Sequence, residues 1–301
     1  MENDEESDPD LQAGRLRYVS QTSRLLCSTT FGGKKGMIYL NSDFEKEWFG
    51  KDVFEEAFRL DGEVFRSVKT RRTFRFELNG KSYFAKIHLG VGWREIVKNL
   101  LQLKRPILGA RNEYEAIRKL EELGVATMKV AAFGERGKNP SQIESFIITE
   151  ELTDTISLED YCRDRNVTPP PFALKKALIE YVATVSRTLH QNGVNHRDYY
   201  ICHFLFDVSK DWKNGISASL IDLHRAQIRK KTPRRWVVKD VAGLYFSAMD
   251  IGLTQRDLFR FMMLYSGVSL RETLRRDIAF WRVVEHVAKK LQAKEARSPK
   301  G

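Results

Sequence analysis

Segments rich in β-branched and aromatic residues mark the first half of the chain, and segments with apolar residues at helical spacing mark the second. The first kind predicts strands at 62–68, 73–78, 82–88, 130–134 and 145–149. Asn79-Gly80 lies between the second and third of these segments, and both residues tolerate the positive φ of a tight turn. We therefore expect an antiparallel hairpin at that point, within a small sheet.

The helical spacing predicts helices at 94–103, 112–123, 157–162, 174–189, 240–249 and 255–266, with one more strand at 217–228. Gly124 and Gly193 follow two of these helices and are expected to end them. The sum is an α+β fold with two lobes. A β-rich N-lobe is expected over 37–152 and an α-rich C-lobe over 153–301, which ends in a basic helix and tail from Arg271.

Residues 1–36 show no clear apolar period. They carry six acids and five bases and end in a GGKKG cluster, so we expect them to be disordered. The remainder opens on Met37, and we hypothesise that Met37 is the true start, with the leader an artefact of annotation.

Charge and composition narrow the class of protein. The 301 residues include 51 Lys and Arg against 40 Asp and Glu, a net charge of +11, and only three cysteines at wide spacing. No window approaches the roughly 18 apolar residues of a membrane-spanning helix, and the cysteines favour a reducing cytoplasm. The positive charge calls for an anionic partner, which charge alone leaves open among nucleic acid, a phosphorylated substrate and a membrane surface.

Two aspartates carry the candidate chemistry. Asp198 lies in Asn195-His196-Arg197-Asp198 after a long amphipathic helix, and Asp222 lies in Ile221-Asp222-Leu223 on an apolar segment. Carboxylates on rigid backbone after apolar segments need a cation or a reacting proton as partner. The ordinary alternative is that Asp198 caps a turn and Asp222 accepts backbone hydrogen bonds.

These residues resemble the signature of the protein kinases. His196-Arg197-Asp198 matches the H-R-D of a catalytic loop, Asp222 matches the Asp of D-F-G, and Lys86 matches the lysine of the third strand. Glu113 resembles the glutamate that pairs with this lysine. We prefer it to Glu115 because Glu113 shares a helix face with apolar residues, whereas Glu115 lies four residues before Lys119.

More closely, the chain resembles the lipopolysaccharide core heptose(I) kinases of Gram-negative bacteria, over roughly residues 45–265. The most specific segments are HRDYYICHF and IDLHRAQ. The resemblance implies a bilobal protein-kinase-like fold and ATP-dependent phosphorylation of O4 of the first heptose of the inner core. The acceptor is then heptosylated Kdo-lipid A at the cytoplasmic face of the inner membrane, where the protein would bind peripherally.

The same resemblance assigns roles to the residues. Lys86, oriented by Glu113, would hold the ATP phosphates, Asp222 would coordinate Mg²⁺, and Asp198 would accept the hydroxyl proton of the acceptor. The backbone of the segment Glu150-Glu151-Leu152 would hold adenine as a hinge does. Asp240 resembles the buried aspartate that braces the catalytic loop.

Three departures from the protein kinase pattern stand out. His203 occupies the position of the asparagine that holds magnesium, and it either ligates the metal or only orients the loop. The D-F-G motif is replaced by Asp222-Leu223-His224. The turn over the phosphates, 69–72, contains no glycine but three bases, which either neutralise phosphate or form a solvated hairpin tip.

Basic residues concentrate after Asp222. The segment 225–239 holds seven bases and no acid, and we assign acceptor binding to Arg225, Arg229, Arg234 and Arg235, with a solvated loop as the alternative. The helix expected at 94–103 is basic and amphipathic, so it either touches a bilayer or packs in the core. An acidic carrier protein on the basic face is also compatible with this charge.

Two other functions remain as alternatives. The same scaffold could phosphorylate another sugar, a small molecule or a protein tyrosine, because a fold does not fix its acceptor. A non-catalytic binder of anionic membranes would not need Lys86, Asp198 and Asp222 together. The sequence contains no zinc-finger spacing and no aromatic RNA-binding signature, so we expect no nucleic acid partner.

Overall fold

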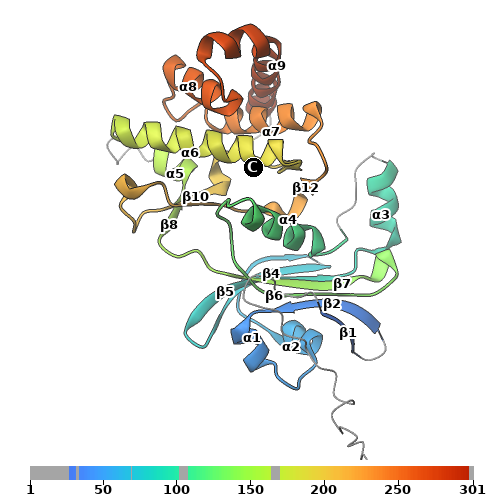
Figure 1. Cartoon of the computed structure of the whole chain (residues 1–301). Coiled ribbons are helices and arrows are strands. Elements are labelled where there is room, and N and C mark those ends of the chain that lie inside the picture. Colours follow the sequence, from blue (N-terminus) through green and yellow to red (C-terminus); the bar gives the residue numbers. More distant parts are fainter. Residues whose placement is uncertain (1–26, 32–33, 69, 102–107, 164–169, 298–301) are drawn as a thin grey trace, which may run out of the picture.

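The structure, a computed structural model, describes residues 27–31, 34–68, 70–101, 108–163 and 170–297. It consists of an N-terminal lobe built on one sheet and a C-terminal lobe built mainly of helices (Figure 1). The N-lobe sheet has the strand order β1-β2-β6-β7-β5-β4-β3, with all neighbours antiparallel. Its strands are β1 (Cys27–Phe31), β2 (Lys34–Leu40), β3 (Glu63–Val68), β4 (Arg71–Leu78), β5 (Lys81–Leu89), β6 (Val130–Arg136) and β7 (Glu144–Glu150).

The predicted hairpin joins β4 to β5. Leu78 pairs with Lys81 across the turn, and Asn79 and Gly80 have φ of 52° and 74°. Both central residues therefore adopt the left-handed conformation that this turn type requires. The five strands predicted for this lobe are confirmed, each within about three residues of its expected ends.

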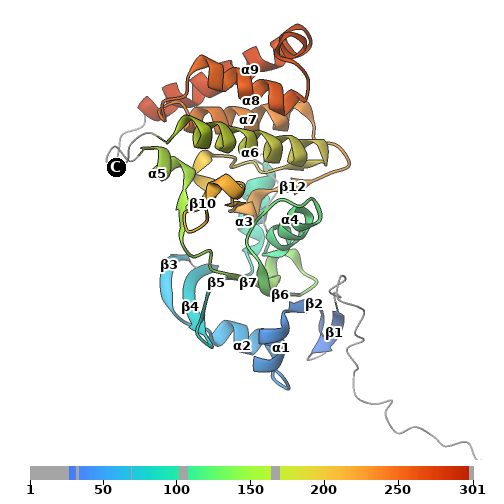
Figure 2. The ribbon, with the colours of Figure 1, turned by 60° about the vertical axis from the view of Figure 1, so that its left-hand side comes forward.

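Alternation along β5 and β7 separates the two faces of the sheet. Ala85, Ile87 and Ile148 pack in one apolar cluster with α1 (Ser42–Glu47) and α2 (Val53–Arg59), whereas Ile147 packs in another with α4 (Arg111–Glu122). Since successive side chains point to opposite faces, Lys86 lies on the α4 face. In both views α4 lies between the sheet and the C-lobe (Figures 1 and 2), so this face is turned toward the C-lobe and is called the cleft face below.

The C-lobe packs its helices around small pieces of sheet. Its helices are α5 (Leu158–Arg163), α6 (Phe172–Gln191), α7 (Arg234–Ser247), α8 (Gln255–Ser266) and α9 (Leu270–Arg297). One further helix, α3 (Gly92–Leu101), belongs to the N-lobe. The strands are β8 (Thr155–Ser157), β9 (Val194–Asn195), β10 (Phe204–Asp207), β11 (Ala218–Leu220) and β12 (Gln227–Ile228). The helices predicted for this lobe are confirmed, and the α+β fold of two lobes is that of the sequence prediction.

Two predictions need correction. The expectation of disorder over 1–36 is wrong for the part that the structure describes, because β1 and the start of β2 form a hairpin there, while 1–26 and 32–33 lie outside the described residues. Gly36 already pairs with Arg136 of β6, so the backbone of the sheet extends upstream of Met37. The expected strand at 217–228 is interrupted, because Asp222 adopts φ 62°, which no continuous strand accommodates.

Candidate active site

Lys86 and Glu113 form the N-lobe half of the candidate site. Lys86 pairs with Thr73 and Ile147 in the middle of the sheet, and its Nζ donates to Glu113 Oε1 at 2.6 Å. The Glu113 side chain is only 2% exposed, on the buried face of α4, as its spacing predicted. A buried carboxylate needs a fixed cation, and Lys86 supplies it while its own ammonium stays partly open to the cleft.

The Asp240 carboxylate binds the backbone of the loop that carries Asp198. Asp240 Oδ2 accepts the backbone N–H of His196 at 2.6 Å, and Oδ1 accepts that of Arg197 at 3.0 Å. Arg197 has φ 76°, a conformation that costs free energy for a non-glycine residue unless such bonds hold it. Gly193 makes the preceding turn, where a Cβ would lie 1.7 Å from the Arg229 carbonyl oxygen. The prediction that Asp240 braces this loop agrees with its contacts.

Asp222 lies at the start of a single turn of 3-10 helix, in the left-handed conformation. His224 Nδ1 donates to Asp222 Oδ1 at 2.6 Å. Burial works against the charged form, but the hydrogen bond from His224 and the charges of His224, Lys86 and His203 hold the pKa of Asp222 well below its usual range. Asp222 is therefore an ionised carboxylate across the physiological range of pH.

His203 connects the two aspartates. Its Nδ1 lies 2.7 Å from the backbone oxygen of Asp198, which can only accept, so this nitrogen carries a proton. In neutral His203 the lone pair is then on Nε2, which lies 3.7 Å from Asp222 Oδ2. Among the described residues, no three His, Cys, Asp or Glu side chains are grouped as a complete metal site. The pair nevertheless suits an ion that takes its remaining ligands from phosphate and water.

Arg225, to which the sequence assigned acceptor binding, binds Asp198. Its Nη1 donates to both carboxylate oxygens of Asp198, at 2.7 and 3.0 Å. The αL turn at Asp222 reverses the chain and brings Arg225 back over the catalytic loop. Acceptor binding by Arg225 stays a prediction, and the structure adds a contact that holds the Asp198 carboxylate.

The other predicted acceptor residues lie around one indole ring. Arg229 donates to Asn195 Oδ1 at 2.5 Å and to Gln227, so it mainly fixes the β9–β12 connection. The cations within 6.0 Å of the Trp236 ring centroid are Arg197, Arg229, Arg235 and Lys239, and Arg234 instead lies over Phe280. Sequence reasoning missed Arg197 and Trp236 here, because their proximity depends on how α7 packs under the loop.

The hinge between the lobes has fewer free backbone groups than expected. The N–H of Glu151 donates to the Ser82 carbonyl at 3.0 Å, and its carboxylate accepts from Arg75 Nε at 2.8 Å. Within the described residues, no hydrogen bond involves the N–H of Leu152. The groups left for adenine are therefore the Glu151 carbonyl and the Leu152 N–H.

The register of β4 and β5 separates the bases of the phosphate turn. Arg71 pairs with His88 and so shares the cleft face with Lys86, whereas Arg72 pairs with Ile87 on the opposite face. Arg72 donates to the Leu60 carbonyl and lies over a phenyl ring, while Lys69 lies outside the described residues. Arg71 Nε is buried without a hydrogen-bond partner among the described residues. Only Arg71 of this pair is placed to meet phosphate.

A β-rich lobe with a Lys–Glu pair, joined to a helical lobe with two aspartates that His203 connects, defines a protein-kinase-like phosphotransferase. Comparison with known proteins gives the family. The profile of the lipopolysaccharide kinase (Kdo/WaaP) family matches residues 55–265, and the chain belongs to this family.

Curated relatives agree with this assignment. The chain is 56% identical over 239 residues to the lipopolysaccharide core heptose(I) kinase WaaP of Escherichia coli K12, covering 79% of this chain and 90% of that one. It is 50% identical to the protein of the same name from Pseudomonas aeruginosa, covering 86% and 97%. Among solved structures, WaaP in complex with acyl carrier protein matches with a TM-score of 0.74 and 46% identity, over 84% of this chain and 98% of that chain. The predicted family and enzyme class are confirmed.

Proposed function

We propose that this kinase transfers the γ-phosphoryl group of ATP to O4 of the first heptose of the lipopolysaccharide inner core. The observation that carries the proposal is the Asp198 carboxylate, which Arg225 binds and which His203 links to Asp222, the carboxylate whose charge Lys86 stabilises. The names of the curated relatives support the heptose as acceptor. The new bond joins the sugar oxygen to phosphorus, the bond from γ-phosphorus to the β-bridging oxygen breaks, and the hydroxyl proton passes to Asp198.

The nucleotide would lie along the N-lobe side of the cleft. Lys86, fixed by Glu113, neutralises phosphate charge, and Arg71 offers a buried Nε that has no partner among the described residues. The Leu152 N–H and the Glu151 carbonyl would hold adenine. Together these groups fix the position of the γ-phosphorus before reaction.

Asp222 and His203 are the residues that would hold Mg²⁺. A bound Mg²⁺ neutralises the charge on the phosphate oxygens. Asp222 is ionised, and His203 Nε2 lies 3.7 Å from Asp222 Oδ2. Oxygen is the preferred ligand of magnesium, so Asp222 is the principal ligand and His203 the second.

Acidic groups of the acceptor would meet the cations around Trp236. Arg197, Arg235 and Lys239 have no ion pair with a carboxylate among the described residues, although acids pair with bases over much of the remaining surface. Inner-core sugars carry carboxylate, which these cations attract. We therefore centre acceptor binding on Arg197, Arg235 and Lys239, with Arg234 at the edge and Arg229 as their support.

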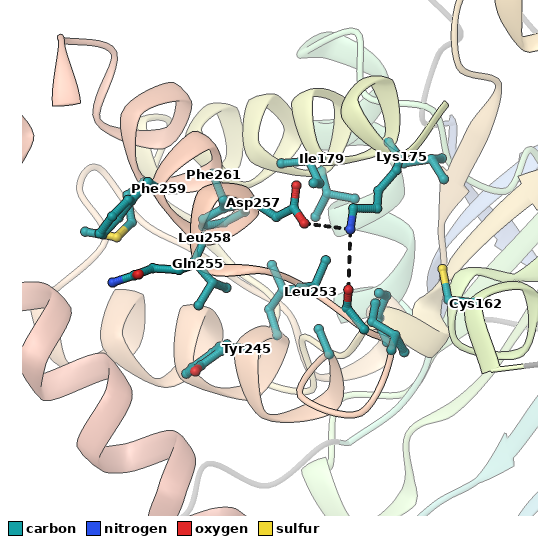
Figure 3. A pocket seen from close by; sticks show the side chains of 18 of the residues that line it. Cys162, Lys175, Ile179, Tyr245, Leu253, Gln255, Asp257, Leu258, Phe259 and Phe261 are labelled. Atoms are coloured by element: carbon teal, nitrogen blue, oxygen red, sulfur yellow. Dashed lines mark hydrogen bonds and ion pairs between the residues drawn. The ribbon is translucent and has the colours of Figure 1, made fainter. Parts of the chain in front are cut away.

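A carrier protein is a further partner. The C-lobe contains a cavity of about 1480 Å³, lined mainly by apolar side chains of α6, α7, α8 and α9. Figure 3 shows the polar contacts of Lys175 in this cavity: its Nζ donates to Asp257 at 2.6 Å and to the Gly252 carbonyl at 3.3 Å. The solved relative was obtained with acyl carrier protein, and an acyl chain is an apolar ligand that such a cavity accommodates. We expect the acylated carrier to bind this chain more tightly than the unacylated carrier. Equal affinities would show that the cavity takes no part in carrier binding.

The activity is tested by phosphate transfer from labelled ATP to purified heptosylated inner core, with Asp198→Ala as the control. We expect transfer to the heptose by the wild type and none by the variant. Transfer that survives in Asp198→Ala would overturn the catalytic assignment. Transfer to a different sugar or to tyrosine, with none to heptose, would leave the kinase but replace its acceptor.

A further inference from the structure

Helix α3 exposes almost all of its apolar residues. Trp93, Val97, Leu100 and Leu101 recur at the spacing of one helix face, and their exposed fractions are 56%, 49%, 56% and 81%. Ile96 is the buried exception. The prediction left core packing and bilayer contact as alternatives for this helix, and within the described residues the structure excludes core packing for the face as a whole.

A helix of this length is not stable in water on its own intrinsic propensity. Here α3 follows directly on β5 through Gly90 and Gly92, both at positive φ, and a Cβ on Gly90 would lie 2.8 Å from the Ser141 carbonyl oxygen. The helix packs on the 3-10 turn Pro140–Gln142, and Ile96 is the one buried side chain among those that the structure describes on it. A contiguous apolar face on such a helix indicates a surface that a partner molecule or a membrane covers.

The charge and the position of α3 indicate which partner covers its apolar face. Arg94 and Lys98 lie exposed beside the apolar face, where Lys98 also pairs with Glu95 at 3.5 Å, and the whole chain carries a net charge of +11. Leu89, also exposed, precedes α3 and donates its N–H to Thr70, next to the phosphate turn. In Figure 1 α3 lies on the same side of the molecule as β12, which leads into the basic segment 229–239.

We propose that α3 is the bilayer-docking element of this kinase, inserting Trp93, Val97, Leu100 and Leu101 into an anionic phospholipid surface. Apolar insertion flanked by Arg94 and Lys98 is the arrangement of an interfacial helix. A kinase docked in this way would hold its active site at the membrane surface, where a lipid-anchored acceptor lies. Only this last consequence rests on the proposed function. No helix in the described residues has the length and apolarity needed to cross a membrane.

The test is flotation of the full chain with vesicles, without ATP or acceptor. We expect binding to vesicles of phosphatidylethanolamine and phosphatidylglycerol, weaker binding to phosphatidylcholine alone, and a loss of about tenfold in affinity for Trp93→Ser and for Leu100→Ser. The matched control is Phe49→Ser, because Phe49 is 87% exposed and lies in the N-lobe after α1. The control should bind as the wild type does.

A second readout separates docking from chemistry. Trp93→Ser and Leu100→Ser should phosphorylate a soluble, deacylated acceptor at the wild-type rate and a vesicle-embedded acceptor about tenfold more slowly. Wild-type protein that fails to float, or equal losses in Phe49→Ser, would overturn the proposal. Loss of carrier-protein binding with unchanged vesicle binding would also overturn it and assign α3 to the carrier. An inactive enzyme whose vesicle binding follows the expected pattern would contradict the proposed function alone.

Discussion

The two halves of the site have opposite signs and opposite kinds of support. In the N-lobe half the working group is a cation, Lys86, and its support, Glu113, is 2% exposed. In the C-lobe half the working groups are carboxylates, Asp198 and Asp222, and their supports, Arg225 and His224, remain partly open. Arg225 is 38% exposed.

This difference separates a permanent pair from one that a substrate can share. Removing either member of a buried pair leaves an uncompensated charge, which is strongly destabilising. A pair open to water has little net effect on stability, because solvent replaces the missing partner. Arg225 can therefore turn some of its donors to an incoming phosphate, whereas Glu113 serves only Lys86.

The largest effect on activity is expected for Asp198, the residue proposed to accept the proton of the acceptor hydroxyl. Asp198→Asn retains the size of the side chain and its contact with Arg225 but cannot accept a proton, so kcat should fall about 10³-fold. Initial rates at saturating ATP and acceptor measure this. An unchanged circular dichroism spectrum is the control for folding. A kcat within tenfold of wild type would mean that Asp198 neither takes the proton nor positions the hydroxyl.

The buried pair gives the next effect, on activity and stability together. Lys86→Met should lower kcat about 10²-fold and, by leaving Glu113 buried without its cation, lower the free energy of unfolding by about 3 kcal/mol. The double variant Lys86→Met/Glu113→Gln should regain most of that stability but no activity. Urea unfolding of the three proteins measures it. A double variant less stable than Lys86→Met would contradict the account of Glu113 as a buried charge held by one partner.

The open pair should behave differently. Arg225→Met is expected to lower kcat about tenfold, because Asp198 loses its positioning contact, but to change the free energy of unfolding by less than about 1 kcal/mol. The same urea experiment gives the comparison with Lys86→Met. Equal destabilisation by the two substitutions would remove the distinction between the halves.

The sequence predicted the elements whose signals are local. The Asn79-Gly80 turn, the helix face of Glu113 and the order of Lys86, Asp198 and Asp222 depend on near neighbours and a known pattern. Helices α1 and α2 were missed, although Asn41 and Asp52 cap them with side chains that accept backbone N–H groups, a signal present in the sequence. Short helices of this kind give too few turns for a clear apolar period.

Long-range pairing explains what the sequence could not predict. Arg225 and Asp198 lie 27 positions apart, and their contact depends on the left-handed conformation of Asp222, which no propensity predicts for aspartate within an apolar segment. The count of bases in 225–239 was correct, but a count cannot say which base turns inward. Likewise, the occupied N–H of Glu151 depends on how β5 ends beside the hinge.

The last effect, which concerns stability alone, tests whether the N-lobe half can hold a second cation. His88 lies on the cleft face beside Lys86, and burial, together with the charges of Arg71, Lys86 and His224, lowers its pKa from 6.5 to about 3. The unfolded chain takes up a proton on His88 below pH 6.5, while the folded chain does so only near pH 3. Stability from this group is therefore complete above pH 6.5 and falls with pH through that window, by about 2 kcal/mol at pH 5.

His88→Gln should remove this dependence. The drop in the free energy of unfolding between pH 7 and pH 5, measured by urea, should be about 2 kcal/mol smaller in the variant than in the wild type, whatever the substitution costs at pH 7 itself. His286→Gln, which alters an exposed histidine on α9, is the matched control and should leave the drop unchanged. If His88→Gln and His286→Gln gave the same drop, His88 would be able to take up a proton in the folded protein. The N-lobe half of the site would then tolerate a second cation beside Lys86.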